Sequence, residues 1–95
     1  MPKGYWIVHN RIDDVDGYEN YKTAAAPALK EYGARFIVRG GSQTLLEGDM
    51  KPRTVVIEFE SVQAAQACYS SATYQAAKAI RETMAVGDLV IVEGG

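Results

Sequence analysis

The segment from Arg53 to Glu60 constrains the fold of this chain more than any other, because its residues alternate strictly in character. The side chains in one phase are apolar: Val55, Ile57 and Phe59. The side chains between them are mixed: Thr54, Val56 and Glu58. Successive side chains of a strand point to opposite faces of a sheet, so this pattern predicts a strand with one face in a core.

Three further strands are predicted from runs of aromatic and β-branched residues: 4–12, 34–39 and 86–93. Gly40 and Gly41 close the second of these strands, and residues 42–47 are expected to extend it after a bend. A turn at Gly48 and Asp49 then leads the chain towards Arg53.

A long helix is predicted to begin after the aspartates at positions 13–14, which suit an N-cap, and to end before Gly33. Pro27 cannot donate a backbone hydrogen bond, so a kink or a break is expected just before it. Two more helices are predicted behind serine caps: Ser61 to about Tyr69, and Ser71 to about Met84.

The order of these elements is strand, helix, strand, strand, helix pair, strand. This order predicts a ferredoxin-like α+β fold, with a four-stranded antiparallel sheet that carries its helices on one face. The chain has 95 residues, of which 47% are hydrophobic. Both values fit a single domain over residues 1–95 with a core of its own.

The sheet face turned away from the helices is expected to be partly apolar. The residues that share this face mix apolar with polar types: Tyr5, Ile7, His9 and Arg11 in the first strand, Val56 and Glu58 in the third, and Asp88, Val90 and Val92 in the last. A bare apolar surface of this size favours association. The sequence therefore predicts a homodimer in which two copies cover this face, related by a two-fold axis.

Charge and cysteine usage exclude several classes of protein. The net charge is −2, and the ten basic residues are scattered singly rather than gathered in a stripe, which argues against nucleic-acid binding. No apolar run approaches the roughly 20 residues that span a bilayer, so no membrane association is expected. Cys68 is the one cysteine, and the N-terminus leads directly into a strand rather than a signal peptide. We therefore expect a cytoplasmic protein.

Short motifs along nearly the whole chain resemble the bacterial proteins grouped as domain of unknown function 1330. They are Gly4-Tyr5-Trp6-Ile7, Asp14 to Tyr18, Tyr21, Gly33-Ala34-Arg35-Phe36, Arg39-Gly40-Gly41, Leu46-Glu47-Gly48-Asp49, Arg53, Val56-Ile57-Glu58-Phe59, Ala65, Tyr69, Ser71, Tyr74, Arg81 and Val92-Glu93-Gly94. The resemblance implies a dimeric α+β barrel, in which two ferredoxin-like sheets face each other. That family carries no established activity, and its relatives by fold include cofactor-free monooxygenases, haem-degrading proteins, dehydratases and ligand-binding modules.

His9 and Glu58 form the first candidate site. His9 is the only histidine, and its ordinary pKa near neutrality suits a general acid or base. Glu58 points away from the core on the strand expected to pair with that of His9, so its carboxylate could orient the imidazole. The alternatives are a histidine that only fills a sheet position, and an ion pair of Glu58 with Arg11, Arg39 or an arginine of the partner.

A second group of candidates suits ligand binding. Arg39, beside Gly40 and Gly41, could hold a carboxylate or phosphate through its guanidinium. Five tyrosines from the predicted helices could line a pocket for a planar ligand, with Arg81 supplying charge: Tyr18, Tyr21, Tyr32, Tyr69 and Tyr74. Of these, Tyr21, Tyr69 and Tyr74 are the chosen candidates. The alternative is that these tyrosines pack at the edge of the core with their hydroxyl groups in water.

No metal or cofactor is expected, because the lone histidine and the lone cysteine are far apart and no phosphate-binding glycine motif is present. Cys68 is interpreted as a small buried apolar residue. The main functional hypothesis is a module whose dimer forms a cleft beside the sheet, edged by His9, Arg39 and Glu58, that binds a small polar or anionic metabolite. The alternative is a cofactor-independent enzyme, monooxygenase-like or isomerase-like, with His9 as base and Arg39 stabilising the oxyanion. A protein that only binds other proteins is the third hypothesis.

Overall fold

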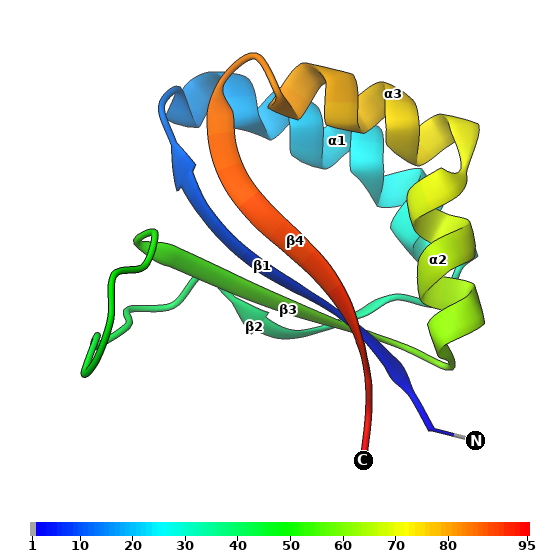
Figure 1. Ribbon diagram of the computed structural model, residues 1–95. Coiled ribbons are helices and arrows are strands. Elements are labelled where there is room, and N and C mark those ends of the chain that lie inside the picture. The colour runs from blue at the N-terminus through cyan, green and yellow to red at the C-terminus, as the bar shows by residue number, and fades with distance from the viewer. Residues whose placement is uncertain (1) are drawn as a thin grey trace.

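The computed structural model describes residues 2–95 of the chain. Within them, one antiparallel sheet carries helices on a single face, and the long strands curve beneath those helices (Figure 1). The elements are β1 (Gly4–Ile12), α1 (Val15–Glu31), β2 (Arg35–Arg39), β3 (Arg53–Phe59), α2 (Val62–Ser70), α3 (Ala72–Arg81) and β4 (Ala85–Glu93). The strand order is β2-β3-β1-β4. This is the predicted ferredoxin-like arrangement, with the second helix of the motif divided into α2 and α3.

The core lies between the sheet and the helices, and the indole of Trp6 is at its centre. The Trp6 ring packs against Phe59 and Tyr74, with ring centroids 5.1 and 4.8 Å away. Its Nε1 donates a hydrogen bond of 3.0 Å to the backbone oxygen of Ala65, so the one polar atom of the ring is satisfied. Burying an aromatic ring of this kind contributes roughly 2–3 kcal/mol to folding.

The predicted break in the first helix is wrong, because α1 runs without interruption through Pro27. Pro27 and Thr23 are both exposed, so water can reach the Thr23 carbonyl that lacks a backbone partner. The helix begins as predicted, since the Asp14 carboxylate accepts a hydrogen bond from the backbone N–H of Gly17. It ends at Gly33, whose φ of 68° lies in the left-handed region.

Residues 42–47 do not form the predicted extension of β2. Gly40 has a φ of 75°, which turns the chain away from the sheet. The segment up to Pro52 then projects beyond the sheet as an irregular loop, drawn in green in Figure 1. The Gln43 amide holds the base of this loop by donating a hydrogen bond of 3.0 Å to the backbone oxygen of Lys51.

The outer face of the sheet, opposite the helices, is partly apolar as predicted. Its exposed apolar side chains come mainly from the two edge strands: Val38 in β2, and Val86, Val90 and Val92 in β4. Among residues 2–95, no helix combines the length and the apolar character that crossing a membrane requires.

Candidate functional site: a cavity between sheet and helices

A cavity of about 530 Å³ lies between the sheet and the helices α1 and α3. Val8, Val55 and Leu89 form part of its floor. Aromatic and cationic side chains line its other sides, together with three small residues: Ala25 and Ala26 of α1, and Ala34. Short side chains at these positions leave space that a larger residue would fill, so the cavity follows from the alanine-rich middle of α1.

The charged residues that line this cavity are all cationic: Lys22, Lys30, Arg39, Arg53 and Arg81. The arginines of the chain divide cleanly by location. Outside the cavity, Arg11 pairs with Asp13 at 2.8 Å and Arg35 pairs with Glu58 at 3.9 Å. Within residues 2–95, no carboxylate oxygen lies within 4.0 Å of any of the three arginines that line the cavity. Among the described residues, the three arginines of the cavity therefore have no carboxylate partner, whereas Lys22 pairs with Glu19 at 3.1 Å.

Arg53 is held at one end of the cavity by a small polar cluster. Its Nη1 donates to the Tyr18 hydroxyl at 3.3 Å and, at the limit of hydrogen-bond length, to Oδ1 of Asn10 at 3.5 Å. Asn10 Nδ2 donates to the same hydroxyl at 3.4 Å. Asn10 faces Arg53 directly in the β1–β3 ladder, and Tyr18 reaches both from the first turns of α1.

Gly40 makes room for the Arg53 guanidinium. A Cβ atom at position 40 would lie 2.6 Å from Arg53 Nε and 3.2 Å from Cζ, so another residue there would displace the side chain. The Arg39-Gly40-Gly41 motif therefore shapes the cavity in two ways. It supplies one arginine, and it permits a second arginine to lie against the backbone.

Tyr21, Tyr74 and Arg81 form a second polar cluster, between α1 and α3. The Tyr21 and Tyr74 hydroxyl oxygens are 2.8 Å apart, and Arg81 Nη1 donates to the Tyr74 hydroxyl at 3.2 Å. Burial raises the pKa of Tyr74 and, less strongly, that of Tyr21 above the ordinary value for tyrosine. Both hydroxyl groups therefore keep their protons at neutral pH, and one of them donates to the other.

Arg39 reaches the cavity because of an irregularity in β2. Phe36 faces Ile57 and Arg39 faces Val55, both on the inner side of the sheet, although residues three apart in a regular strand point to opposite faces. A register shift between Phe36 and Val38 brings them to the same side. The Arg39 guanidinium carbon then lies 3.9 Å from the centroid of the Phe36 ring, a cation–π contact.

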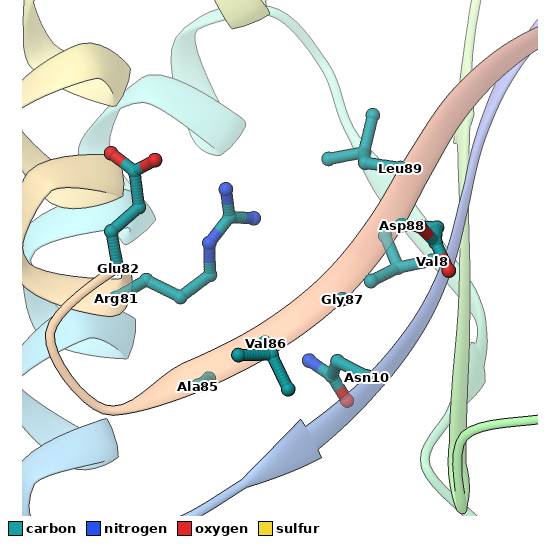
Figure 2. Close-up of a pocket in the computed structure, with 9 residues that line it drawn as sticks. All are labelled: Val8, Asn10, Arg81, Glu82, Ala85, Val86, Gly87, Asp88 and Leu89. Atoms are coloured by element: carbon teal, nitrogen blue, oxygen red, sulfur yellow. The ribbon is translucent and has the colours of Figure 1, made fainter.

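A smaller cavity, of about 340 Å³, adjoins the first at the start of β4 (Figure 2). Val8, Arg81 and Leu89 line both cavities. In Figure 2 the Arg81 side chain extends from the end of α3 into the space above β4, and Asn10 lies on the neighbouring strand. Arg81 thus stands where the two spaces meet.

The expected pairing of His9 with Glu58 is wrong. His9 lies opposite Thr54 in the β1–β3 ladder, and Glu58 lies opposite Tyr5, four residues further along. At about 3.4 Å per residue, four residues separate them by roughly 14 Å along the strands. His9 Nδ1 is instead 3.0 Å from the Thr54 hydroxyl. Both residues also belong to the outer face of the sheet, whereas the cavity lies on the helix side.

Glu58 is engaged in contacts of its own on that outer face. It accepts a hydrogen bond from the Tyr5 hydroxyl at 3.2 Å and lies 3.9 Å from Arg35 and 4.0 Å from Lys3. The carboxylate therefore forms an ion pair within the chain, although with Arg35 rather than with Arg11 or Arg39. Nothing in this geometry lets it orient the imidazole of His9.

The remaining candidates divide between cavity and core. Tyr21, Tyr74, Arg39 and Arg81 line the larger cavity. Tyr69 does not, because its ring packs edge-on against Trp6, with centroids 6.1 Å apart. Cys68 is fully buried, and burial raises the pKa of its thiol to about 11. No group of three or more metal-ligating side chains exists among residues 2–95.

Sequence reasoning missed two residues of the site, Asn10 and Arg53, and named Tyr18 only as one of the helix tyrosines. One signal was present. Asn10 continues the inward phase of Trp6 and Val8, and a polar residue at a core position needs a partner. Arg53 also begins the inward phase of β3, so its side chain was placed to meet Asn10.

The fold and the strand order define this chain as a ferredoxin-like α+β protein. A family model, Domain of unknown function (DUF1330), matches residues 3–95, and the chain belongs to that family. The family predicted from the short motifs is therefore confirmed.

Solved structures with the same fold come from several bacteria. A protein of unknown function from Rhodopseudomonas palustris is 16% identical, with a TM-score of 0.78 over 99% of this chain and 83% of that one. SnoaB, a cofactor-independent oxygenase from Streptomyces nogalater, is 10% identical, with a TM-score of 0.63 over 97% and 92%. A dimeric ferredoxin-like protein of unknown function from Thermobifida fusca is 24% identical, with a TM-score of 0.59 over 97% and 89%. Among curated proteins the chain has no match.

Proposed function

We propose that this protein binds a small organic anion in the cavity between the sheet and the helices. The observation that carries the proposal is that, among residues 2–95, no carboxylate lies beside Arg39, Arg53 or Arg81, whereas the other two arginines are both paired. Arg53 and Arg81 are only partly exposed, so their charges are partly desolvated without compensation. An anionic ligand supplies the missing charge.

The shape of the cavity suits a ligand with an apolar body. A volume of about 530 Å³ falls in the range of small-molecule sites, which are mostly apolar with a few placed polar groups. Here the floor is aliphatic and the polar groups gather around Arg53 and Arg81. The class of ligand is the one predicted from the sequence, but the proposed binding site lies on the helix side of the sheet instead of on its outer face.

The same groups favour binding over proton abstraction. A general base must accept a proton, and the ionisable groups that line the cavity are tyrosines, lysines and arginines. Burial raises the pKa values of Tyr21 and Tyr74, so both are poor bases at neutral pH. These residues hold and orient an anion rather than deprotonate it.

A thermal-shift screen tests the proposal, because a ligand that binds only the folded state raises the melting temperature. Small carboxylates and phosphate esters are compared with their neutral amides and alcohols. We expect stabilisation by some anions in the wild type, its loss in the triple variant Arg39→Gln, Arg53→Gln, Arg81→Gln, and its retention in the matched control Arg11→Gln, Arg35→Gln. Equal stabilisation of both variants would refute an arginine-lined site.

A cofactor-independent enzyme remains the second candidate, supported by the similarity of the fold to the oxygenase SnoaB. His9 is the base proposed for it, and its Nδ1 is engaged with Thr54, which leaves Nε2 available. Because His9 belongs to the outer face, this reaction needs a substrate on that face. Turnover that is lost in His9→Ala but kept in the triple arginine variant would favour this candidate.

We further propose that the chain acts as a homodimer in the cytoplasm. The exposed valines of β2 and β4 support association through the outer face, and the Thermobifida fusca structure with this fold is described as dimeric. A single buried thiol is compatible with a reducing compartment.

A further inference from the structure

The arginines of the cavity leave specific hydrogen-bond donors unused. Arg53 donates to Tyr18 and Asn10 through Nη1 alone, and Arg81 donates to Tyr74 through Nη1 alone. A guanidinium carries five N–H groups. Within residues 2–95 no fully buried side-chain nitrogen or oxygen lacks a partner, so the unused nitrogens of Arg53 and Arg81 are in contact with open space. Each arginine therefore presents an unengaged edge that a ligand can reach.

Two tyrosine protons are also unused. The Tyr18 oxygen accepts hydrogen bonds from both Arg53 and Asn10, and no protein acceptor lies within reach of its own proton. Tyr21 and Tyr74 share a single hydrogen bond, so one of the two hydroxyl protons has no partner in the protein. Together with the arginine edges, these hydroxyl groups are donors of the cavity lining, and among them Tyr21 is partly exposed whereas Tyr18 and Tyr74 are buried.

The lining of the larger cavity offers few hydrogen-bond acceptors, and the side-chain acceptors Asn10, Glu82 and Asp88 line the smaller adjoining cavity instead. The lining of the larger cavity contains no aspartate, glutamate, asparagine, glutamine, histidine, serine or threonine, and its side chains are aliphatic, aromatic or cationic. An amine, a sugar or a zwitterionic amino acid would leave its own N–H or O–H groups unpaired here. The matching group is one that only accepts, and a carboxylate matches the planar edge of an arginine with both oxygens.

Aromatic rings form part of the wall: those of Tyr21 and Phe36 are partly exposed to it, and Trp6, Tyr18 and Tyr74 are buried behind them. The chain has nine aromatic residues, and five of them line this one cavity: Trp6, Tyr18, Tyr21, Phe36 and Tyr74. Aromatic rings pack favourably in tilted or offset contact with another ring, beyond the gain from buried area alone. A flat ring fits this wall better than a flexible chain of equal volume.

From these contacts we infer that the ligand is an aromatic carboxylate of one or two rings. Its carboxylate oxygens lie on the unengaged edges of Arg53 and Arg81, and its ring packs against the aromatic wall. This inference rests on the proposed binding of an organic anion and narrows it to one chemical class.

Titration calorimetry with three probes of similar shape tests the inference: naphthoate, its neutral carboxamide, and the fully saturated decahydronaphthoate. Loss of the charge removes the arginine contacts, so the carboxamide is expected to bind at least about tenfold more weakly than naphthoate. Loss of aromaticity is expected to weaken binding by about three- to tenfold. Arg53→Gln and Arg81→Gln should each weaken naphthoate binding about tenfold or more, while Arg35→Gln leaves it unchanged.

The outcomes separate this inference from the broader proposal. If the saturated acid binds as tightly as naphthoate, and Arg81→Gln weakens both, an anion site exists but the aromatic class is wrong. If an aliphatic acid or a phosphate ester from the thermal-shift screen binds and naphthoate does not, the inference fails and the proposed function stands. If no anion binds in the thermal-shift screen or in the calorimetric titration, the inference and the proposed function are both overturned. Circular dichroism spectra and melting temperatures of the variants establish that each one is folded.

Discussion

The hydroxyl groups of Tyr21 and Tyr74 lie 2.8 Å apart, and their hydrogen bond joins α1 to α3 at the cavity. Arg81 donates to the same Tyr74 hydroxyl from the last residue of α3. The Tyr21 and Tyr74 rings also meet edge-on, with centroids 6.3 Å apart. This contact connects the packing of the helices to the donor groups of the candidate site.

Removal of the Tyr74 hydroxyl is expected to destabilise the fold. In Tyr74→Phe the hydroxyl of Tyr21 and the guanidinium of Arg81 lose a partner at a fully buried position, which costs about 1–3 kcal/mol. Tyr69→Phe is the matched control, because Tyr69 packs against the same core through its ring and its hydroxyl makes no hydrogen bond to a side chain or backbone of residues 2–95. Urea denaturation measures the free energy of unfolding of Tyr74→Phe and of Tyr69→Phe. An equal loss of stability in the two variants would show that the hydrogen bonds of the Tyr74 hydroxyl do not stabilise the fold.

Stability is expected to fall at alkaline pH. Tyr21 and Tyr74 have raised pKa values in the fold, so the unfolded chain releases these protons first. Their contribution is fully present below the ordinary tyrosine pKa of about 10 and is lost as the pH rises above it. The free energy of unfolding is measured by urea titration across this range. The background is Cys68→Ala, because burial raises the pKa of that thiol to about 11.

The matched comparison for this pH dependence is Tyr21→Phe, Tyr74→Phe in the same background. This variant should lose less stability than its parent between neutral and strongly alkaline pH. If the free energy of unfolding falls equally steeply with pH in both proteins, groups other than Tyr21 and Tyr74 cause the loss of stability at alkaline pH.

Gly40→Ala is expected to weaken anion binding as well as stability. The substitution places a Cβ in the left-handed region, at a cost of about 1–2 kcal/mol, and pushes it against the Arg53 guanidinium. Gly33→Ala is an apt control, because its φ of 68° imposes similar strain while the new Cβ meets no atom within 4 Å. Both variants should therefore lose similar stability, and Gly40→Ala alone should bind the anion more weakly. If Gly40→Ala and Gly33→Ala bind the anion with similar affinity, Arg53 does not contribute to anion binding.

Val90→Glu is expected to dissociate the proposed homodimer. Val90 is 51% exposed on the outer face of β4, and a charge there would be buried without a partner if two sheets pack together. Val15→Glu serves as control, because Val15 is 71% exposed at the start of α1. Sedimentation should show a dimer for the wild type and for Val15→Glu, and a monomer for Val90→Glu. A wild type that sediments as a monomer at micromolar concentration would contradict the dimer.

Most of the fold follows from local patterns that the sequence displays. Alternation identifies β3, and the caps Asp14, Ser61 and Ser71 mark where the three helices begin. The uninterrupted course of α1 through Pro27 was not predictable, because it depends on which side of the helix faces water.

The location of the site was beyond prediction for a different reason. Alternation tells which residues share a sheet face, and it correctly places His9 and Glu58 away from the core. It does not tell which face holds an unfilled space. That depends on how closely the small side chains of Ala25 and Ala26 let α1 approach the sheet. The bulge that brings Arg39 beside Phe36 is likewise a tertiary feature with no local signature.

The most direct test of the anion site is a chemical-shift titration of the isotope-labelled protein with the anion that raises the melting temperature most. We predict that the perturbed amides cluster around the helix side of the sheet, at Asn10, Tyr18, Arg53 and Arg81. Perturbations centred on His9 and Thr54 instead, with these cavity residues unchanged, would place the ligand on the outer face and contradict the account.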